Sequence, residues 1–189
     1  MSVIQPWSAR AHEGADLRNL LVAAVGESLS AVRYVVPRGA SWPEGHRDNR
    51  AHEVDMAVEL VMLSGAVLVL SWAMDGLKEG LAIELREPGD LDSNLPGDAV
   101  DVSSHVDWSG FLGESIINVT PAWHVPNEGC PEMPWAFRFE FSNTSGLVVA
   151  LGEAEGSGFT YMPDALVVIF DTRLAASYKI PASATSSCG

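Results

Sequence analysis

The chain has 189 residues and carries 25 acidic residues against 11 basic ones, for a formal net charge of -14. A surface of one negative sign repels nucleic acid and anionic membranes and attracts basic partners, so the composition argues against nucleic-acid and membrane binding. Apolar residues make up 47% of the chain and charged residues 19%, which favours a packed core over disorder. We expect one α+β domain over residues 1–181 and a flexible tail over residues 182–189, which are rich in serine and alanine.

The N-terminal residues, the longest apolar run and the two cysteines indicate the compartment. The first residues lack a basic stretch followed by an apolar run, so we expect no secretory signal. The longest apolar run, residues 57–74, is interrupted by Glu59 and by a Ser-Gly pair, which argues against a membrane span. Only Cys130 and Cys188 are present, and Cys188 lies in the expected tail, so we expect no structural disulfide and a cytoplasmic protein.

The first predicted element is a helix over residues 16–25. Asp16 can cap it, Gly26 can end it, and apolar side chains three and four residues apart share one face. That face consists of Leu17, Leu20, Leu21, Ala24 and Val25. A β-rich run over residues 29–36 follows and stops at Pro37.

The middle of the chain alternates between polar loops and apolar strands. Residues 37–50 and 88–98 are rich in polar residues, glycine and proline, and both are predicted to be surface loops. Ser64 and Gly65 separate two apolar runs in a way that is typical of a hairpin. The predicted strands of this region are residues 56–63, 66–74, 81–85 and, at a sheet edge, 100–106.

The second half of the chain contains the clearest strand pattern. Residues 135–141 alternate strictly, and one face is aromatic: Trp135, Phe137, Phe139 and Phe141. Residues 147–151 are predicted to return as the second arm of a hairpin, and residues 115–125 form a strand bent by Pro121.

A run without polar alternation, residues 164–170, predicts a strand buried on both faces, and Asp171 caps a short helix over residues 172–178. Strands do not alternate with long helices along the chain. The sequence therefore predicts an α+β fold with a largely antiparallel sheet of about six to eight strands, an N-terminal helix and a short C-terminal helix.

Three residues are candidates for metal binding or acid–base chemistry. His105 and Asp107 lie on the same side of the predicted strand, and His124 on another strand could join them. The remaining histidines have irregular spacing, and the sequence contains neither HExxH nor a Cys–His zinc pattern. The sequence favours ordinary surface residues at these positions, so we expect no metal and no cofactor.

Other catalytic signatures are missing as well. The sequence has no Gly-x-Ser-x-Gly elbow and no phosphate-binding glycine loop followed by lysine. Cys130 stands between Glu128 and Glu132, which would raise the pKa of a thiol and not activate it. Glu153 and Glu155 could hold a cation, but solvated charges beside a turn are the simpler interpretation. We do not expect an enzyme.

These observations favour an acidic protein-binding module that docks a basic partner. Acid-rich loops would supply the contacts, and tryptophans beside loops would anchor them. The candidate partner-binding residues are Asp90, Asp92, Asp98, Glu153, Glu155, Trp108 and Trp123. In charge and size the chain resembles bacterial immunity proteins, whose carboxylates complement the basic site of a nuclease toxin, and this implies an immunity-type or inhibitor role.

Three alternatives remain open at this point. The chain could be a small-molecule-binding protein or enzyme with a pocket between sheet and helix, in which His105, Asp107 and His124 supply the chemistry. It could be a structural or assembly subunit whose tryptophans lie in an interface. The negative charge could also serve solubility alone.

Overall fold

The computed structural model describes residues 7–8, 11–42, 47–48, 51–89, 96–144, 146–155 and 158–178. One sheet has five strands in the order β6 (Lys78–Arg86), β5 (Val67–Asp75), β4 (Ala57–Met62), β1 (Leu29–Pro37) and β7 (Gly97–Asp101). A second has six, in the order β2 (Arg47–Asp48), β3 (Ala51–Val54), β13 (Leu166–Ile169), β10 (Gly146–Leu151), β9 (Met133–Phe141) and β8 (Ile116–His124). A small hairpin pairs β11 (Glu153–Glu155) with β12 (Gly158–Thr160), and the helices are α1 (Ala11–Ala24) and α2 (Thr172–Ser177).

The α+β class and the antiparallel pairing are confirmed, because every strand pair that the structure describes is antiparallel. The expected strand number is wrong. The described residues hold thirteen strands in three sheets instead of about six to eight in one. Four strands that the sequence did not predict, β2, β3, β11 and β12, are two to four residues long, which is too short for a period-two pattern to emerge from sequence.

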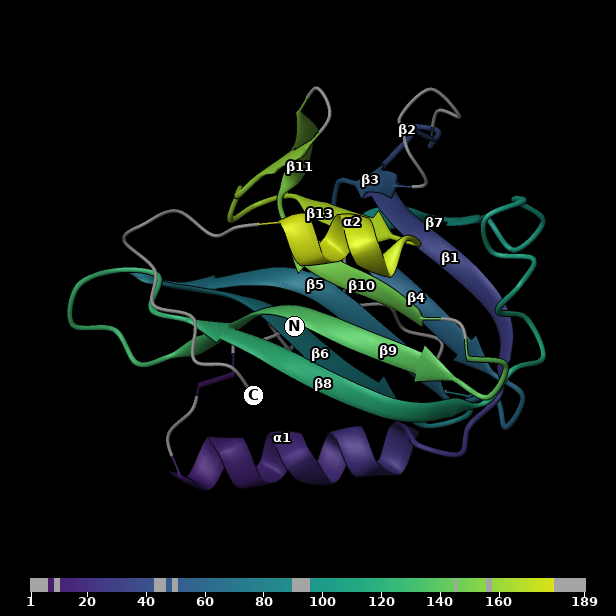
Figure 1. Cartoon of the computed structure of the whole chain (residues 1–189), viewed down its shortest axis with the longest axis horizontal. Coiled ribbons are helices and arrows are strands. Elements are labelled where there is room, and N and C mark those ends of the chain that lie inside the picture. The colour runs from purple at the N-terminus through teal and green to yellow at the C-terminus, as the bar shows by residue number, and fades with distance from the viewer. Residues whose placement is uncertain are drawn as a thin grey trace.

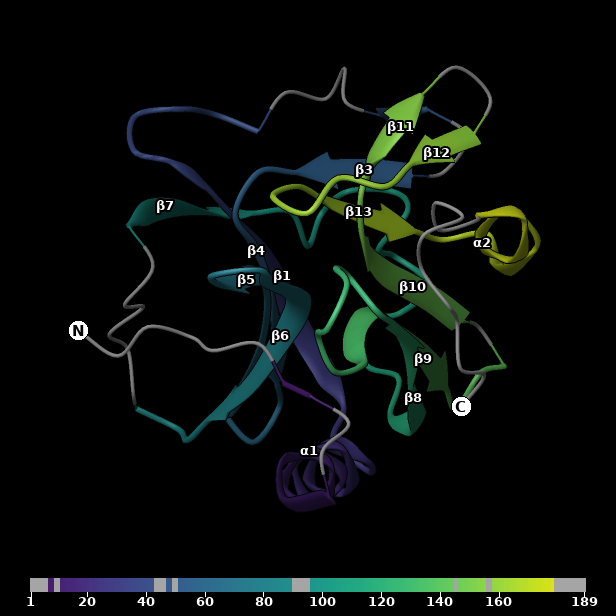
Figure 2. The same ribbon diagram turned by 90° about the vertical axis from the view of Figure 1, so that its left-hand side faces the viewer.

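The two large sheets pack face to face (Figure 2), and the apolar core between them contains aliphatic and aromatic side chains. The four aromatic side chains of β9 are buried as predicted, with Arg138 exposed on the other face. β13 lies between β3 and β10 and all four of its residues are buried, which confirms the prediction of a strand buried on both faces. The hairpin of β4 and β5 around Gly65 is also confirmed.

Helix α1 packs against β6 and β8, the edge strands of the two large sheets, along one side of the molecule (Figure 1). It begins at Ala11, so the prediction that Asp16 caps its N-terminus is wrong; Glu13 supplies the acid in its first turn. Its end is as predicted, since Gly26 follows with φ of 93° and donates to the carbonyl of Ile116. The buried face is Leu17, Leu21 and Ala24, whereas Val25 lies past the helix and is 45% exposed.

A long connection crosses from the five-stranded sheet to the six-stranded sheet between β7 and β8. The expected strand over residues 100–106 is wrong beyond Asp101, because a turn begins there. The Asp101 carboxylate accepts the backbone N–H of Ser103, and the Ser103 hydroxyl oxygen accepts the N–H of Val32 at 2.9 Å. Trp108 and Phe111 are both buried and anchor this connection in the core. His105 and Asp107 therefore lie in a turn region and not on a strand.

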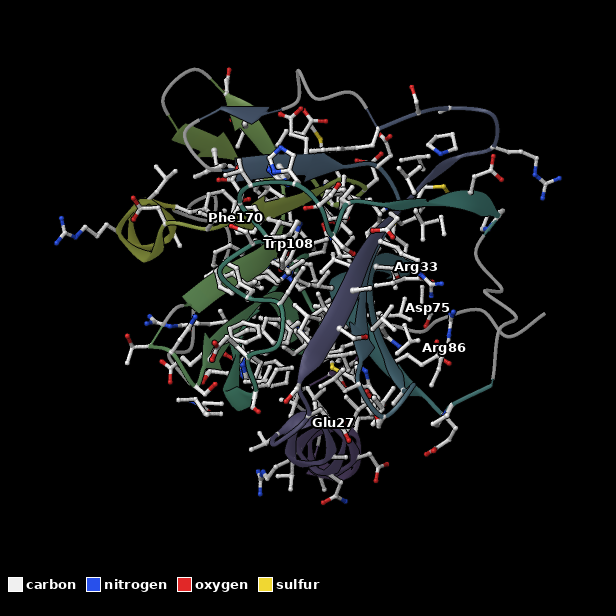
Figure 3. The ribbon with its side chains drawn as sticks, turned by 90° about the vertical axis from the view of Figure 1, so that its right-hand side faces the viewer. Glu27, Arg33, Asp75, Arg86, Trp108 and Phe170 are labelled. Atoms are coloured by element: carbon white, nitrogen blue, oxygen red, sulfur yellow. The ribbon has the colours of Figure 1, made fainter. Side chains whose placement is uncertain are left out.

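The outer face of the five-stranded sheet contains a buried carboxylate. Glu59 is 1% exposed, with its Oε2 2.8 Å from Nε of Arg33 and its Oε1 3.7 Å from Nη1 of Arg86. Figure 3 shows both arginines on the side of this sheet that faces away from the core. Arg86 is itself buried and has a second carboxylate, Glu84, at 3.4 Å. Each buried charge compensates the other. Removal of one of them destabilises the folded protein, because the remaining charge is buried without a partner.

We predict that Glu59→Gln lowers the free energy of unfolding by about 3 kcal/mol, because it leaves the Arg86 guanidinium buried without its inner partner. Urea unfolding at pH 7 measures this. Glu84→Gln is the matched control: its side chain is 41% exposed, so its pairing with the same arginine contributes less than about 1 kcal/mol. Equal losses in the two variants would contradict the prediction.

Candidate functional site

Three polar residues from two distant parts of the chain come together in the structure: His52, His105 and Asp107, which we call the His–Asp cluster. His52 is on β3 and is fully buried; the other two come from the connection between β7 and β8. Nε2 of His52 is 3.2 Å from Oδ2 of Asp107, and Nδ1 of His105 is 3.7 Å from the same oxygen. One ligand atom from each residue lies within 4.8 Å of the others. Residues 55 positions apart thus form a single polar group.

A hydrogen-bonded chain orients His52. The indole N–H of Trp108 donates to the hydroxyl of Tyr34 at 3.0 Å, and that hydroxyl lies 2.7 Å from Nδ1 of His52. Because the Tyr34 oxygen accepts from Trp108, its own proton can be donated to Nδ1, which leaves the His52 proton on Nε2 facing Asp107. Burial raises the pKa of Tyr34 well above its usual value, so the hydroxyl keeps its proton.

Aromatic rings surround the His–Asp cluster. The rings of Trp42 and Phe170 lie 4.8 and 4.7 Å from that of His52, centroid to centroid, and Trp42 also contacts His105 at 5.7 Å. Figure 3 places Phe170 and Trp108 side by side in the interior, in agreement with the 4.8 Å between their rings. An imidazole between a tyrosine and a carboxylate can act as a base or bind a metal ion.

His124, the third residue of the expected group, lies elsewhere. It ends β8 and is buried beside the ring of Tyr161, at 5.3 Å. Burial lowers the pKa of His124 to about 4, and a hydrogen bond with the backbone of Glu79 offsets part of that effect. The structure therefore brings His105 and Asp107 together with His52 and not with His124.

Sequence reasoning missed His52 because it occurs in a segment that looks polar. The signal that could have found it is that His52 shares one face of β3 with Val54, and both are buried, whereas Glu53 on the other face is partly exposed. Two polar residues of opposite orientation side by side are compatible with a short strand that has one face in the core. Four residues are too few for this pattern to stand out.

The candidate partner-binding residues fall in different places. Asp90 and Asp92 lie outside the described residues. Asp98 is exposed on the edge strand β7, where its carboxylate accepts the N–H of Gly39 at 2.8 Å. Trp108 is fully buried, so it offers no surface to a partner.

Glu153 and Glu155 are both exposed on β11, at the end of the molecule where β3, β11 and β13 meet (Figure 1). There a cleft of about 130 Å³, which we call the acidic cleft, is lined by Trp42, Glu53, Asp55 and Glu153, with Val54, Ala165 and Leu166 as its apolar part. Glu53 holds β11 against β3, since its carboxylate accepts the N–H of Ala154 at 2.8 Å. Three carboxylates beside one indole form a site that suits a cation.

A second hollow lies between α1 and β8. This apolar groove of about 290 Å³ is lined chiefly by Leu17, Leu21, Val22, Val25, Val119, Pro121 and Trp123, with Gly14, Arg18 and Asn118 beside them. Val22 is 66% exposed although it is apolar, and Trp123 is half-buried. None of the His–Asp cluster residues lines this groove, so its chemistry is that of an apolar binding surface.

No protein-family model, no curated protein and no solved structure matches this chain. Within the described residues, neither helix has the length and apolar character that crossing a membrane requires.

We predict that the free energy of unfolding falls as the pH is lowered from about 6.5 to 4, in part because of His124. The unfolded chain takes up a proton on this imidazole near pH 6.5, whereas the folded protein does so only near pH 4. Above about pH 6.5 the buried imidazole of His124 does not lower the free energy of unfolding. Below about pH 4 it lowers this free energy by up to about 3 kcal/mol. His124→Gln removes this contribution.

Urea unfolding of both proteins between pH 4 and 8 tests the prediction. The difference between them at pH 8, where His124 is neutral in both states, serves as the reference. The variant should gain stability relative to the wild type as the pH falls. Stability curves that run parallel from pH 7 to 4 would show that His124 does not contribute.

Proposed function

We propose that this chain is an acidic protein-binding module that docks a basic protein partner through the acidic cleft. The observation that carries the proposal is the convergence of Glu53, Asp55 and Glu153 beside Trp42 in one cleft. These carboxylates come from segments about 100 residues apart, so their meeting is a property of the fold and not of local composition.

The size and chemistry of the acidic cleft suit one lysine or arginine side chain. A cation over the face of an indole gains about 0.5–2 kcal/mol, and charge-assisted hydrogen bonds to carboxylates add to this. A hydrogen bond holds the Trp42 ring in place beside the cleft, because the indole N–H donates to the carbonyl of Glu53 at 2.8 Å. Val54 and Leu166 provide the apolar wall that the methylene groups of such a side chain need.

The net charge of -14 supports the same partner class. A strongly negative protein attracts a basic one over distances of about 10 Å at moderate salt, which speeds association. Glu155 and Asp164 are exposed near the acidic cleft and extend its negative surface. An inhibitor or immunity-type protein of a basic enzyme is the form of this function that we propose.

Affinity capture with three immobilised baits tests this proposal: the wild type, Asp55→Asn/Glu153→Gln in the cleft, and Glu87→Gln/Glu128→Gln as control. All four residues are exposed, so both double variants change the net charge equally without touching the core. We expect the wild type and the control to retain the same basic protein at about 50 mM salt and to release it by roughly 300 mM. The cleft variant should retain little of it.

Equal losses in the two double variants would show that charge acts collectively, and the cleft proposal would be wrong. A captured partner without a basic surface, bound equally in all three cases, would overturn it as well.

The apolar groove between α1 and β8 favours a second candidate function, the binding of a small apolar molecule. Its volume of about 290 Å³ is at the lower end of the range for ligand pockets, and its walls are largely aliphatic with one indole. This candidate involves binding without chemistry, because His105, Asp107 and His124 do not line the groove.

We predict that Val22→Glu weakens the binding of the neutral dye Nile red about fivefold, equivalent to roughly 1 kcal/mol of lost apolar contact. Fluorescence titration measures this. Val106→Glu is the control, because Val106 is 60% exposed, is apolar and lies outside the groove, so it adds the same charge elsewhere. If both variants bind the dye like the wild type, the groove is not a ligand site.

A further inference from the structure

We propose that the His–Asp cluster is a binding site for a divalent metal ion of the zinc type, held by Nε2 of His52, Nδ1 of His105 and Oδ2 of Asp107. This site is separate from the acidic cleft and does not depend on the proposed docking function. Two imidazoles and one carboxylate are a ligand set that Zn²⁺, Co²⁺ and related ions prefer, whereas Mg²⁺ and Ca²⁺ prefer oxygen ligands alone.

The distances between the ligand atoms carry the proposal. Zinc binds nitrogen and oxygen at about 2.0–2.1 Å, so two ligands of a tetrahedral ion lie about 3.4 Å apart. The two distances to Oδ2 of Asp107 are 3.2 Å from Nε2 of His52 and 3.7 Å from Nδ1 of His105, and one ligand atom of each residue lies within 4.8 Å of the others. The two ring nitrogens lie within 4.8 Å of one another, so an ion that binds all three residues requires a shift of up to about 1.4 Å between the two rings. Nδ1 of His105 accepts the backbone N–H of Asp107 at 3.2 Å, and binding of an ion through this atom would replace that hydrogen bond. One tetrahedral position remains for a fourth ligand.

The surroundings of His52 have the form of a metal site's outer shell. A metal-bound histidine uses its second ring nitrogen to contact a group that fixes the ring. In His52 this nitrogen is Nδ1, at 2.7 Å from the Tyr34 hydroxyl oxygen. With an ion on Nε2, the imidazole proton would be on Nδ1 and would be donated to the Tyr34 oxygen, which also accepts from the Trp108 indole. The cluster lies where β1 and β3, strands of the two different sheets, come into contact.

The burial of the three side chains supports a metal site over a chance grouping of polar residues. His52, Asp107 and His105 have side-chain exposures of 0%, 7% and 12%, and aromatic rings pack against them. Two imidazoles and a carboxylate are costly to place in an aromatic core unless they bind one another or an ion. The competing explanation is a purely structural hydrogen-bonded chain from Trp108 through Tyr34 and His52 to Asp107.

Titration of the purified, chelator-treated wild-type protein with Co²⁺ alone separates these explanations. We expect strong visible absorption, because tetrahedral cobalt absorbs far more than the octahedral cobalt that surface carboxylates hold, and Zn²⁺ should displace it at one equivalent. Zn²⁺ should also raise the melting temperature, since an ion that binds only the folded state stabilises it.

Variants locate the site. His105→Ala, at the partly accessible residue, should weaken Zn²⁺ binding at least about 100-fold, and Tyr34→Phe about 10- to 100-fold through loss of the orienting hydroxyl. His124→Gln should bind Zn²⁺ like the wild type, because His124 lies outside the cluster. Circular dichroism shows which variants are folded, and the measurement on the wild type stands without them.

The proposal is overturned if Co²⁺ gives no tetrahedral spectrum with the wild type, which would assign the cluster to the structural chain. It is overturned equally if folded His105→Ala gives the same spectrum and the same Zn²⁺ affinity as the wild type.

Discussion

The hydroxyl group of Tyr34 is the contact on which the centre of this structure depends. It belongs to a central strand of the five-stranded sheet, accepts from Trp108 of the crossing connection and meets His52 of the six-stranded sheet. Three parts of the chain therefore share one oxygen in a core that is otherwise largely apolar. A buried polar group is costly unless it is hydrogen-bonded, so the positions of these three side chains constrain one another.

The sequence could predict those parts of the fold that repeat a pattern over several residues. The alternating aromatics of β9 and the two apolar runs of the hairpin at Gly65 contain enough positions for burial to show a pattern, and β13 stands out because its run is apolar without interruption. The end of the strand at Asp101 could not be predicted, because it depends on Ser103 reaching Val32, about 70 positions away. Local pattern does not contain a contact of that kind.

The sites were less predictable than the fold for the same reason. His105 and Asp107 were visible as a pair in sequence, but their partner His52 is supplied by the pairing of β3 with β13. Trp108 is a candidate partner-binding residue in sequence because it stands beside a predicted loop. Instead it fills the core, since a tryptophan whose N–H finds an acceptor can be buried completely. The acidic cleft likewise needs the β11 hairpin to fold back onto Glu53.

Trp42 connects the two proposed sites. Its ring lines the acidic cleft and also packs on both histidines of the His–Asp cluster, at 4.8 and 5.7 Å. A cation stacked on the indole in the cleft and an ion held by the histidines would be separated by little more than this ring. Two positive charges in a region of low dielectric constant repel one another, while the carboxylates of the cleft and of Asp107 attract both. Occupation of one site should therefore alter the affinity of the other site for its cation. By linkage, each cation changes the affinity for the other by the same factor.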